Sequence, residues 1–473
     1  MYTTVNFFYS TSLMIRFVGT ILLLFSLLPT GAFASEIEPA VHPATSLSPA
    51  AMIAMAIFVL GYLGITLEHR YPFHKSALAL ITGVSVWIVA AAASRGSHII
   101  EETLHNTGAE IFEIIAFLLC AMGLVEILVH YRFFDMIRVK LMKLNFDDHK
   151  QFLVISYLTF FLSAILDNLT VTIVMTQIAL RFFKDKNNLM VMVANIVIMA
   201  NAGGAWSPIG DVTTIMLWLA QKFSSLNIII EGFLPSFVLG TVATLMLSRN
   251  VVKNGGDVTE ETSIHFRRGE RIIISLAILS FLLPLAAHSI GLRPYQGLLL
   301  GLGLVWSAIE FLKTYSKAPT YLDTNIEAIL QKVDISSLQF FIGILLAVSG
   351  LQVLGVLDYF SAIILGEAQE PSRIIVGNIV LGLLSAIVDN VPLTALAIDI
   401  IKVHDPALWV LLALTVGTGG SVLIIGSVSG IVAMGMVKEL RFDRYLKIAS
   451  IPALVAYAVG CGVWYVQYLL FLK

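Results

Sequence analysis

Two short stretches of the sequence are near copies of each other, and each places an aspartate and an asparagine inside a long apolar run. Residues 163–172 read SAILDNLTVT, and residues 385–394 read SAIVDNVPLT. A charged side chain is costly inside a membrane, so an acid in such a run indicates a functional site. The same costly cluster occurs in both halves of the chain, which indicates a duplicated gene and a paired site.

A glycine-rich run follows each of these stretches and interrupts the apolar segment in which it lies. Residues 201–214 read NAGGAWSPIGDVTT, where Pro208 removes a backbone donor and the glycines let the chain leave the helix. The second run, TVGTGG at 415–420 and GSVSG at 426–430, carries hydroxyls but no carboxylate. Because a broken helix frees backbone carbonyls that bind cations, we expect both runs to meet the Asp-Asn stretches near the bilayer centre.

These four segments offer only oxygen ligands, namely carboxylates, amide carbonyls, hydroxyls and backbone carbonyls. Hard cations prefer such ligands, and no Cys or His cluster marks a transition metal. No Arg or Lys lies within the motifs, so the carboxylates require a mobile cation such as Na⁺, Li⁺ or a proton. Burial favours the neutral form of a carboxylic acid, whereas a bound cation favours its charged form. Each buried acid is therefore expected to hold either a proton or a metal ion, which is the basis of exchange.

The candidate site residues form two sets, and neither includes a catalytic residue or a cofactor ligand. Asp211 could instead cap the half-helix that follows it, and the two threonines beyond it could satisfy backbone groups in the break. The first set binds cations and protons, with Na⁺ or Li⁺ at its first four members: Asp167, Asn168, Asp389, Asn390, Asn201, Asp211, Thr213, Thr214 and Ser385. The second set comprises further polar residues in or near the same segments: Thr170, Ser207, Thr394, Thr418, Ser427, Ser429 and Glu113.

The composition is that of a polytopic membrane protein. The chain has 473 residues, of which 58% are hydrophobic and 13% charged, and its mean hydropathy is +0.89. A soluble domain has about 25% charged residues. The formal net charge of −2 gives no sign of a nucleic-acid partner. Cys120 and Cys461 lie in apolar runs and are too few for a disulfide framework. We therefore expect an all-α protein in a lipid bilayer.

The N-terminus has the pattern of a signal peptide. Arg16 precedes the apolar run 17–28, and the small-residue stretch 32–34 follows it, as in an n-region, an h-region and a cleavage site. The apolar run is short for a membrane span, which needs about 20 residues. We expect residues 1–34 to be a removed leader and residues 35–49 a polar external leader, with an uncleaved extra helix as the alternative.

The apolar segments predict ten spans and two re-entrant hairpins. The stretches 152–180 and 374–401 are each too long for one span and too short for two. Three spans precede each hairpin and two follow it, so residues 50–248 and 272–473 form two repeats, joined by a cytoplasmic linker at 249–271. The predicted spans lie near 50–66, 77–93, 111–129, 189–220, 228–248, 272–289, 297–312, 335–356, 408–437 and 448–470.

The positive charges predict how this layout sits in the membrane. With the mature N-terminus outside and each hairpin returning to its own side, most of the 29 Lys and Arg fall in cytoplasmic loops, as the positive-inside rule requires. If the hairpins were single spans, the basic loops would fall on opposite sides. The first hairpin then opens from the inside and the second from the outside. Such inverted repeats, with a site at the bilayer midplane, are typical of secondary transporters, and both mature termini are expected outside.

The run NAGGAWSPIGDVTTIMLW at 201–218, with both SAI-x-DN elements, closely resembles the NhaD family of bacterial sodium/proton antiporters. The resemblance extends from about residue 50 to the end of the chain. It implies efflux of Na⁺ or Li⁺ against inward protons, in a multi-pass protein of the bacterial inner membrane that contains the two hairpins. Related members of the ion transporter superfamily are homodimers in which a transport domain slides against a scaffold. The positions that match the family's polar set are those of the first candidate set, whereas Ser427 and Ser429 match less closely.

Two other functions remain open beside antiport. A carrier of an oxyanion or a carboxylate could use the same scaffold, although a site without fixed positive charge disfavours an anionic substrate. An intramembrane aspartyl protease would pair Asp211 with Asp167 or Asp389, but that chemistry needs neither inverted repeats nor the asparagines. The sequence therefore favours a non-enzymatic transporter that works by alternating access around an all-oxygen cation site.

Overall fold

The computed structural model describes residues 47–66, 74–94, 98–143, 146–252, 266–315, 325–364 and 369–472. These residues form helices and connecting loops and include no strand, which confirms the predicted all-α fold. The predicted signal peptide and most of the polar leader after it lie outside the described residues.

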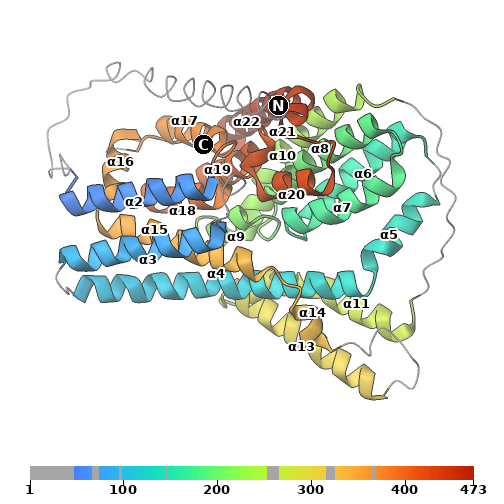
Figure 1. The fold of residues 1–473 in the computed structure, drawn as a ribbon, viewed down its shortest axis with the longest axis horizontal. Helices are drawn as coiled ribbons and strands as arrows, with labels where there is room; N and C mark the ends of the chain where they lie inside the picture. The colour runs from blue at the N-terminus through green and yellow to red at the C-terminus, as the bar shows by residue number, and fades with distance from the viewer. Residues whose placement is uncertain are drawn as a thin grey trace, which may run out of the picture. The chain divides into compact units, whose positions relative to one another are not determined.

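The first half of the chain forms nine described helices, which Figure 1 labels in chain order. They are α2 (Pro49–Thr66), α3 (Lys75–Ser94), α4 (His98–His130), α5 (Phe133–Met142), α6 (Asp148–Ser163), α7 (Asn168–Phe182), α8 (Lys186–Gly204), α9 (Val212–Leu219) and α10 (Ser225–Ser248). Those of the second half are α11 (Arg268–Ser280), α12 (Leu283–Ser289), α13 (Pro294–Tyr315), α14 (Ile326–Leu330), α15 (Ile335–Val353), α16 (Val356–Ile364), α17 (Pro371–Leu384), α18 (Asn390–Ile400), α19 (Pro406–Gly419), η2 (Ile424–Gly426), α20 (Val428–Met436), α21 (Phe442–Ile448), α22 (Ser450–Gln467) and η3 (Tyr468–Leu472).

Seven helices within the described residues are long and apolar enough to cross a membrane. An eighth span results if α11 and α12, which meet at a bend of 41°, are counted together. Shorter apolar helices accompany them, namely α2, α17, α18 and α19. The chain is thus a polytopic membrane protein, and the total of ten spans stays a prediction.

The helices break where the sequence predicted interruptions. Each Asp-Asn pair lies at such a break, because the asparagine is the first residue of α7 in one case and of α18 in the other. The two glycine-rich runs separate α8 from α9 and α19 from α20. The return of each hairpin to its own side of the membrane stays a prediction.

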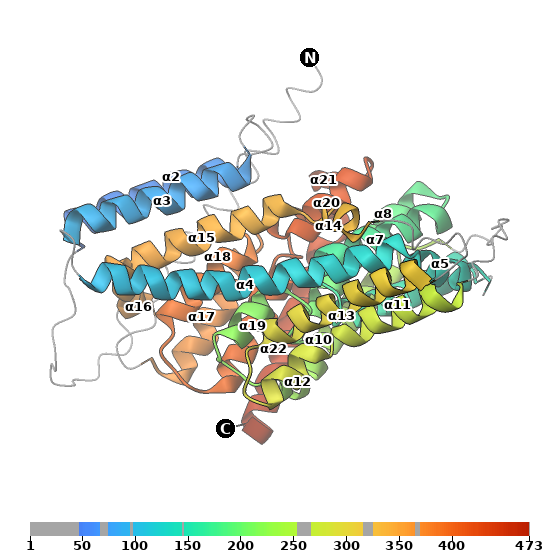
Figure 2. The ribbon, with the colours of Figure 1, turned by 90° about the horizontal axis from the view of Figure 1, so that it is seen from below.

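The described helices pack into two groups, which we call the frame and the core group. The frame consists of α2, α3, α4, α11, α13 and α15, and α3, α4 and α15 lie side by side in both views (Figures 1 and 2). Gly83 and Gly343 let α3 and α15 approach closely, since an added Cβ at Gly83 would lie 2.5 Å from the Gly343 carbonyl oxygen. Small residues commonly allow such close helix packing in membranes.

The core group contains both helix pairs with the Asp-Asn motifs and both broken helices, from α6 to α10 and from α17 to α22. In it, α8 packs on α6 and α7, α19 packs on α17, and α10 packs on α22. The core group touches the frame mainly where α15 meets α18 and α4 meets α9. Both Asp-Asn motifs and both broken helices therefore belong to the core group, which contacts the frame through α9 and α18.

Matching contacts recur in the two halves of the core group. Ser163 Oγ donates to the carbonyl oxygen of Ala200 (2.6 Å), and Ser385 Oγ donates to that of Val416 (2.8 Å). An added Cβ at Gly210 would lie 2.5 Å from the Ser163 carbonyl oxygen, and one at Gly426 would lie 2.5 Å from that of Ser385. The two near-identical motifs thus pack on their broken helices in the same way.

Replacement of Gly203 by alanine is expected to destabilise the core group by about 1–3 kcal/mol, the usual cost of overpacking. An added Cβ there would overlap the backbone carbonyl of Phe160 on α6, which cannot rotate away. The matched control is Gly303→Ala on α13, where an added Cβ meets nothing within 4 Å. Thermal unfolding of the detergent-solubilised variants measures the difference, and equal stability of the two would contradict this packing.

Candidate cation site

Asp211 lies at the start of α9, in the break that follows α8, and its side chain is 1% exposed. Its backbone is extended, with φ −145° and ψ 151°. The Thr214 hydroxyl donates to the Asp211 carbonyl oxygen (2.8 Å) and accepts from the Asp211 N–H (3.3 Å). Because Pro208 disfavours a continuous helix here, the break places the Asp211 carboxylate inside the protein.

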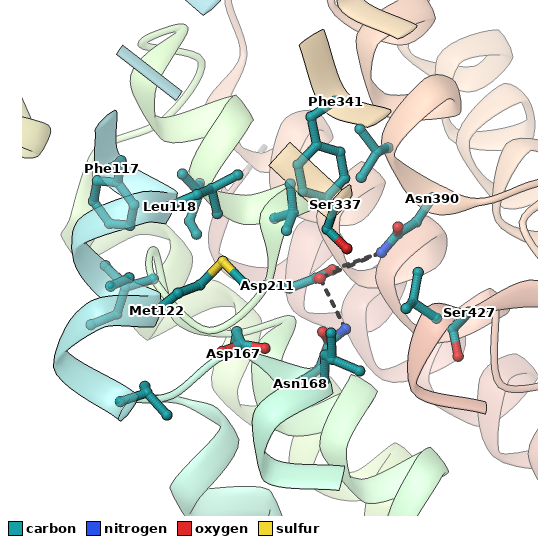
Figure 3. Close-up of a pocket in the computed structure, with 18 of the residues that line it drawn as sticks. Phe117, Leu118, Met122, Asp167, Asn168, Asp211, Ser337, Phe341, Asn390 and Ser427 are labelled. Atoms are coloured by element: carbon teal, nitrogen blue, oxygen red, sulfur yellow. Dashed lines mark hydrogen bonds between the residues drawn. The ribbon is translucent and has the colours of Figure 1, made fainter. Parts of the chain in front are cut away.

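The amides of both Asp-Asn motifs converge on this one carboxylate (Figure 3). Asn168 Nδ2 donates to Asp211 Oδ1 at 3.0 Å. Asn390 Nδ2 donates to Asp211 Oδ2 at 3.1 Å and lies 3.4 Å from Oδ1. Hydrogen bonds to a charged group are worth about 1.5–3 kcal/mol each. Asp211 therefore joins the first residue of α7 to the first residue of α18.

The second broken helix joins the same network through Asn201. Asn168 Nδ2 also donates to Asn201 Oδ1 (3.0 Å), and Asn201 Nδ2 donates to Ser421 Oγ (2.8 Å) and Ser427 Oγ (3.3 Å). Tyr445 fixes the far end, since its hydroxyl donates to the Ser421 carbonyl oxygen at 2.6 Å. All four polar segments predicted from the sequence thus meet in one network.

Asp167 and Asp389 precede the two asparagines and cap their helices. The Asp167 carboxylate accepts from the Thr170 N–H (2.8 Å) and the Thr170 hydroxyl (2.5 Å). The Asp389 carboxylate accepts from the Val391 N–H (3.4 Å), and the Asp389 N–H donates to the Tyr62 hydroxyl (2.9 Å). Both acids also line the cavity that contains Asp211. These caps hold both carboxylates beside the cavity. The side-chain amides of Asn168 and Asn390 donate to Asp211 instead.

This inner cavity has a volume of about 70 Å³, enough for a few water molecules. Its polar lining consists of the three aspartates, the two asparagines, Ser337 and Ser427, and its apolar lining includes Phe117, Met122 and Phe341. All of these except Asp389 are labelled in Figure 3. None of the described residues that line it is Arg or Lys. Across the described part of the chain, no three His, Cys, Asp or Glu side chains are close enough to hold a metal ion together. A cation here would thus be held by at most two of these carboxylates at once, together with amide, hydroxyl or backbone oxygens.

Other predicted site residues are buried near the network but make local contacts. The hydroxyls of Thr394 and Thr418 donate to backbone carbonyls of their own helices. Ser207 accepts from the Ile209 N–H within the break. Thr213 and Ser429 occupy matching positions, two residues after Asp211 and Ser427, and their buried hydroxyls have no hydrogen-bond partner among the described residues.

Glu113 does not join the inner cavity. Its carboxylate lies 3.5 Å from Arg293 Nε and lines a different cavity. Conversely, the structure adds Ser337, Ser421 and Tyr62 to the surroundings of the site. Ser421 lies between the two parts of the second glycine-rich run, 415–420 and 426–430, and could have been found there, whereas Tyr62 and Ser337 come from helices outside the polar segments and carried no sequence signal.

Apolar spanning helices around a buried carboxylate with two amide donors define a polytopic membrane protein with a polar site among its helices. A family model described as citrate transporter matches residues 37–417. The chain is 35% identical to sodium/proton antiporter 1 of Arabidopsis thaliana, over 87% of this chain and 72% of that protein. It is 30% identical to Na⁺/H⁺ antiporter NhaD of Vibrio cholerae (81% of this chain, 84% of the relative) and of Alkalimonas amylolytica (92% and 93%).

The chain therefore belongs to the NhaD-type branch of the citrate transporter family. Members of this family are transporters and not enzymes, so the protease alternative is set aside.

Proposed function

We propose that the protein exchanges cytoplasmic Na⁺ or Li⁺ for external protons. The observation that carries the proposal is the position of Asp211, a buried carboxylate that both hairpin asparagines contact in a cavity without Arg or Lys among the described lining residues. Relatives at 30–35% identity are named sodium/proton antiporters. A site with this charge suits a small cation and disfavours an anion.

Exchange follows from competition for the same oxygen atoms. Without a metal ion, burial favours protonated Asp211, whereas a bound cation favours the charged form. Asn168 and Asn390 hold the carboxylate in place in both cases, and Asp167 and Asp389 add negative charge at the cavity wall. Release of a proton would then accompany binding of Na⁺, and the reverse would occur on the other side.

Alternating access would arise from movement of the core group against the frame. The contacts between the groups are concentrated where α15 meets α18 and α4 meets α9, and the inner cavity is lined from both groups. The matched contacts of Ser163 and Ser385 support two repeats, 50–248 and 272–473. We propose that these repeats have inverted topology and that residues 249–271 link them on the cytoplasmic side. We place the protein in the bacterial inner membrane as a homodimer with both mature termini outside.

A carboxylate or oxyanion carrier is the second candidate, favoured by the family model described as citrate transporter. An anion would need positive charge, which near the cavity comes from the helix N-termini at Asn168 and Asn390 and from Lys75, whose charge acts on Asp389. Those N-termini are already occupied by the Asp167 and Asp389 caps. The caps therefore weigh against this candidate.

Everted vesicles with a respiration-generated pH gradient separate the two functions. Addition of Na⁺ or Li⁺ is expected to dissipate the gradient, and K⁺ serves as the comparison cation. Labelled citrate and arsenite are tested for uptake in the same vesicles. Uptake of either anion together with no response to Na⁺ or Li⁺ would overturn the antiporter assignment in favour of an anion carrier.

A further inference from the structure

A second, larger cavity lies beside the inner cavity between the frame and the core group. Its volume is about 580 Å³, and its walls come from α4, α9, α15, α18 and the loop that carries Arg293. The walls include the acids Glu110, Glu113 and Asp399, and polar side chains such as Ser349. We call this space the outer cavity.

The same four helices line both cavities in succession. On α4 the outer cavity ends at Ile114 and the inner cavity begins at Phe117, and on α9 the inner cavity ends at Ile215 where the outer one begins with Met216. The two cavities are thus consecutive spaces along one set of helices rather than unrelated pockets.

The other two helices repeat this arrangement. On α15 the inner cavity ends at Phe341 and the outer cavity begins at Leu345. On α18 the inner cavity ends at Val391 and the outer cavity begins at Ala395. Since an α-helix rises 1.5 Å per residue, the layer between the cavities is only about one helical turn, or roughly 5 Å, thick. All eight of these boundary residues are apolar, and we call them the apolar layer.

The outer cavity lies on the predicted external side. It is lined by the C-terminal end of α9, at Met216 and Leu219, by Ala220 and Gln221 directly after that helix, and by the end of α18 at Asp399. Lys222 and Lys402, which follow these ends, both fall outside in the topology that the positive-inside rule supports. The direction of the path therefore rests on the proposed orientation of the chain.

The outer cavity carries charges of both signs. Its described lining includes the carboxylates of Glu110, Glu113 and Asp399 and the guanidinium of Arg293, and Lys222 and Lys402 act electrostatically on Asp399 from beside it. Arg293 lies 3.5 Å from Glu113 and donates to the Leu219 carbonyl oxygen at the end of α9 (3.5 Å). The three carboxylates on the wall give an entering cation oxygen partners, which hard cations prefer.

We propose that the outer cavity is the external mouth of the ion path and that the apolar layer is its closed gate. An ion without its water shell does not cross even one turn of apolar side chains cheaply, and apolar constrictions act as gates in channels. Phe117 and Phe341 supply the largest side chains of the gate, and both belong to the frame. In this conformation the gate would keep external cations from the Asp211 site. It would thereby prevent protons or Na⁺ from crossing the membrane without exchange. The proposal rests on the antiport function above.

Labelling with a membrane-impermeant cationic thiol reagent tests this arrangement in right-side-out vesicles. Both native cysteines, Cys120 and Cys461, are buried and are first replaced by alanine. Ser349→Cys then reports the outer cavity and Leu169→Cys the inner cavity. Labelling at Leu169→Cys is expected to be about 100-fold slower, because the charged reagent must cross the apolar layer. Equal rates, or faster labelling at Leu169→Cys, would overturn the gate.

Gate variants supply the second half of the test. Phe117→Ala and Phe341→Ala are expected to speed labelling at Leu169→Cys at least tenfold, because they thin the apolar layer. They are also expected to let protons leak without Na⁺. The control is Phe112→Ala on α4, whose exposed side chain lines neither cavity. No change in labelling with either gate variant would overturn the proposal.

Sodium-dependent exchange is measured on the same preparations to separate this inference from the proposed function. If the labelling pattern holds but Na⁺ moves no protons, the gate stands and the antiport function fails. If exchange is present while both cysteines react alike, antiport stands and the gate is wrong.

Discussion

Replacement of Asp211 by asparagine is expected to abolish Na⁺-driven proton exchange. The carboxylate accepts one amide on each oxygen, from Asn168 at 3.0 Å and from Asn390 at 3.1 Å. Asparagine has one acceptor oxygen, so one of these donors would face an NH₂ group, and the negative charge that balances a bound cation would be lost. Removal of one partner of a buried charge pair costs about 3–5 kcal/mol, more than 100-fold in affinity.

The measurement is the pH gradient in everted vesicles, with cation affinity read separately from the Na⁺-induced shift in thermal unfolding. Asp135→Asn is the control, because Asp135 on α5 forms a surface ion pair with Arg132 (3.1 Å) and lines neither cavity. Its exchange is expected to equal that of the unchanged protein. Wild-type exchange and an unchanged sodium shift in Asp211→Asn would show that the cation binds elsewhere.

The convergence of the four polar segments was predictable from the sequence, because the cost of placing polar residues in apolar runs is visible there. Polar residues in apolar runs, and glycines with a proline inside predicted spans, marked all four segments that the structure brings together. The breaks at Ser163–Asn168 and Gly204–Val212 follow directly from those residues. The structure adds that Ser163 and Ser385, which occupy the same position in the duplicated motif, make matching contacts.

The role of individual side chains was less predictable, because it depends on contacts between distant parts of the chain. Asn201 and its partner Ser421 are 220 residues apart, and Tyr62 and Asp389 are 327 apart. No local pattern links such pairs. The sequence placed the metal ion at Asp167, Asp389, Asn168 and Asn390, and this placement stays a prediction. The structure adds a contact that no local pattern showed, because both asparagines donate to Asp211.

Helix boundaries were least predictable where polar residues continue an apolar helix. The sequence placed a span near 111–129, but α4 begins at His98 and carries Glu101 and Glu102 before its apolar part. A hydropathy window finds only helices with apolar side chains. This extension instead lines the outer cavity with polar residues such as Asn106 and Glu110. The polar extension that hydropathy excludes is thus the part of α4 that would serve the ion path.

Asp167 offers the clearest separation between a structural and an ion-binding carboxylate. Asparagine caps a helix about as well as aspartate does, whereas alanine loses about 1 kcal/mol at such a position. Asp167→Asn can therefore keep the bond from the Thr170 N–H (2.8 Å) while it removes the charge beside the cavity. We expect this variant to fold with nearly unchanged thermal stability and to lose cation-coupled exchange, and Asp389→Asn to do the same.

Asp185 provides the matched control because it caps α8 in the same way. Its carboxylate accepts from the Asn188 N–H at 2.8 Å, and it does not line the inner cavity. Asp185→Asn should keep both stability and exchange, whereas Asp167→Ala should lose stability as well as exchange. Proton flux and thermal unfolding measured on all four variants separate the two roles. Normal exchange in Asp167→Asn would assign that carboxylate to capping alone, and the negative charge needed for a cation would then fall to Asp211 and Asp389.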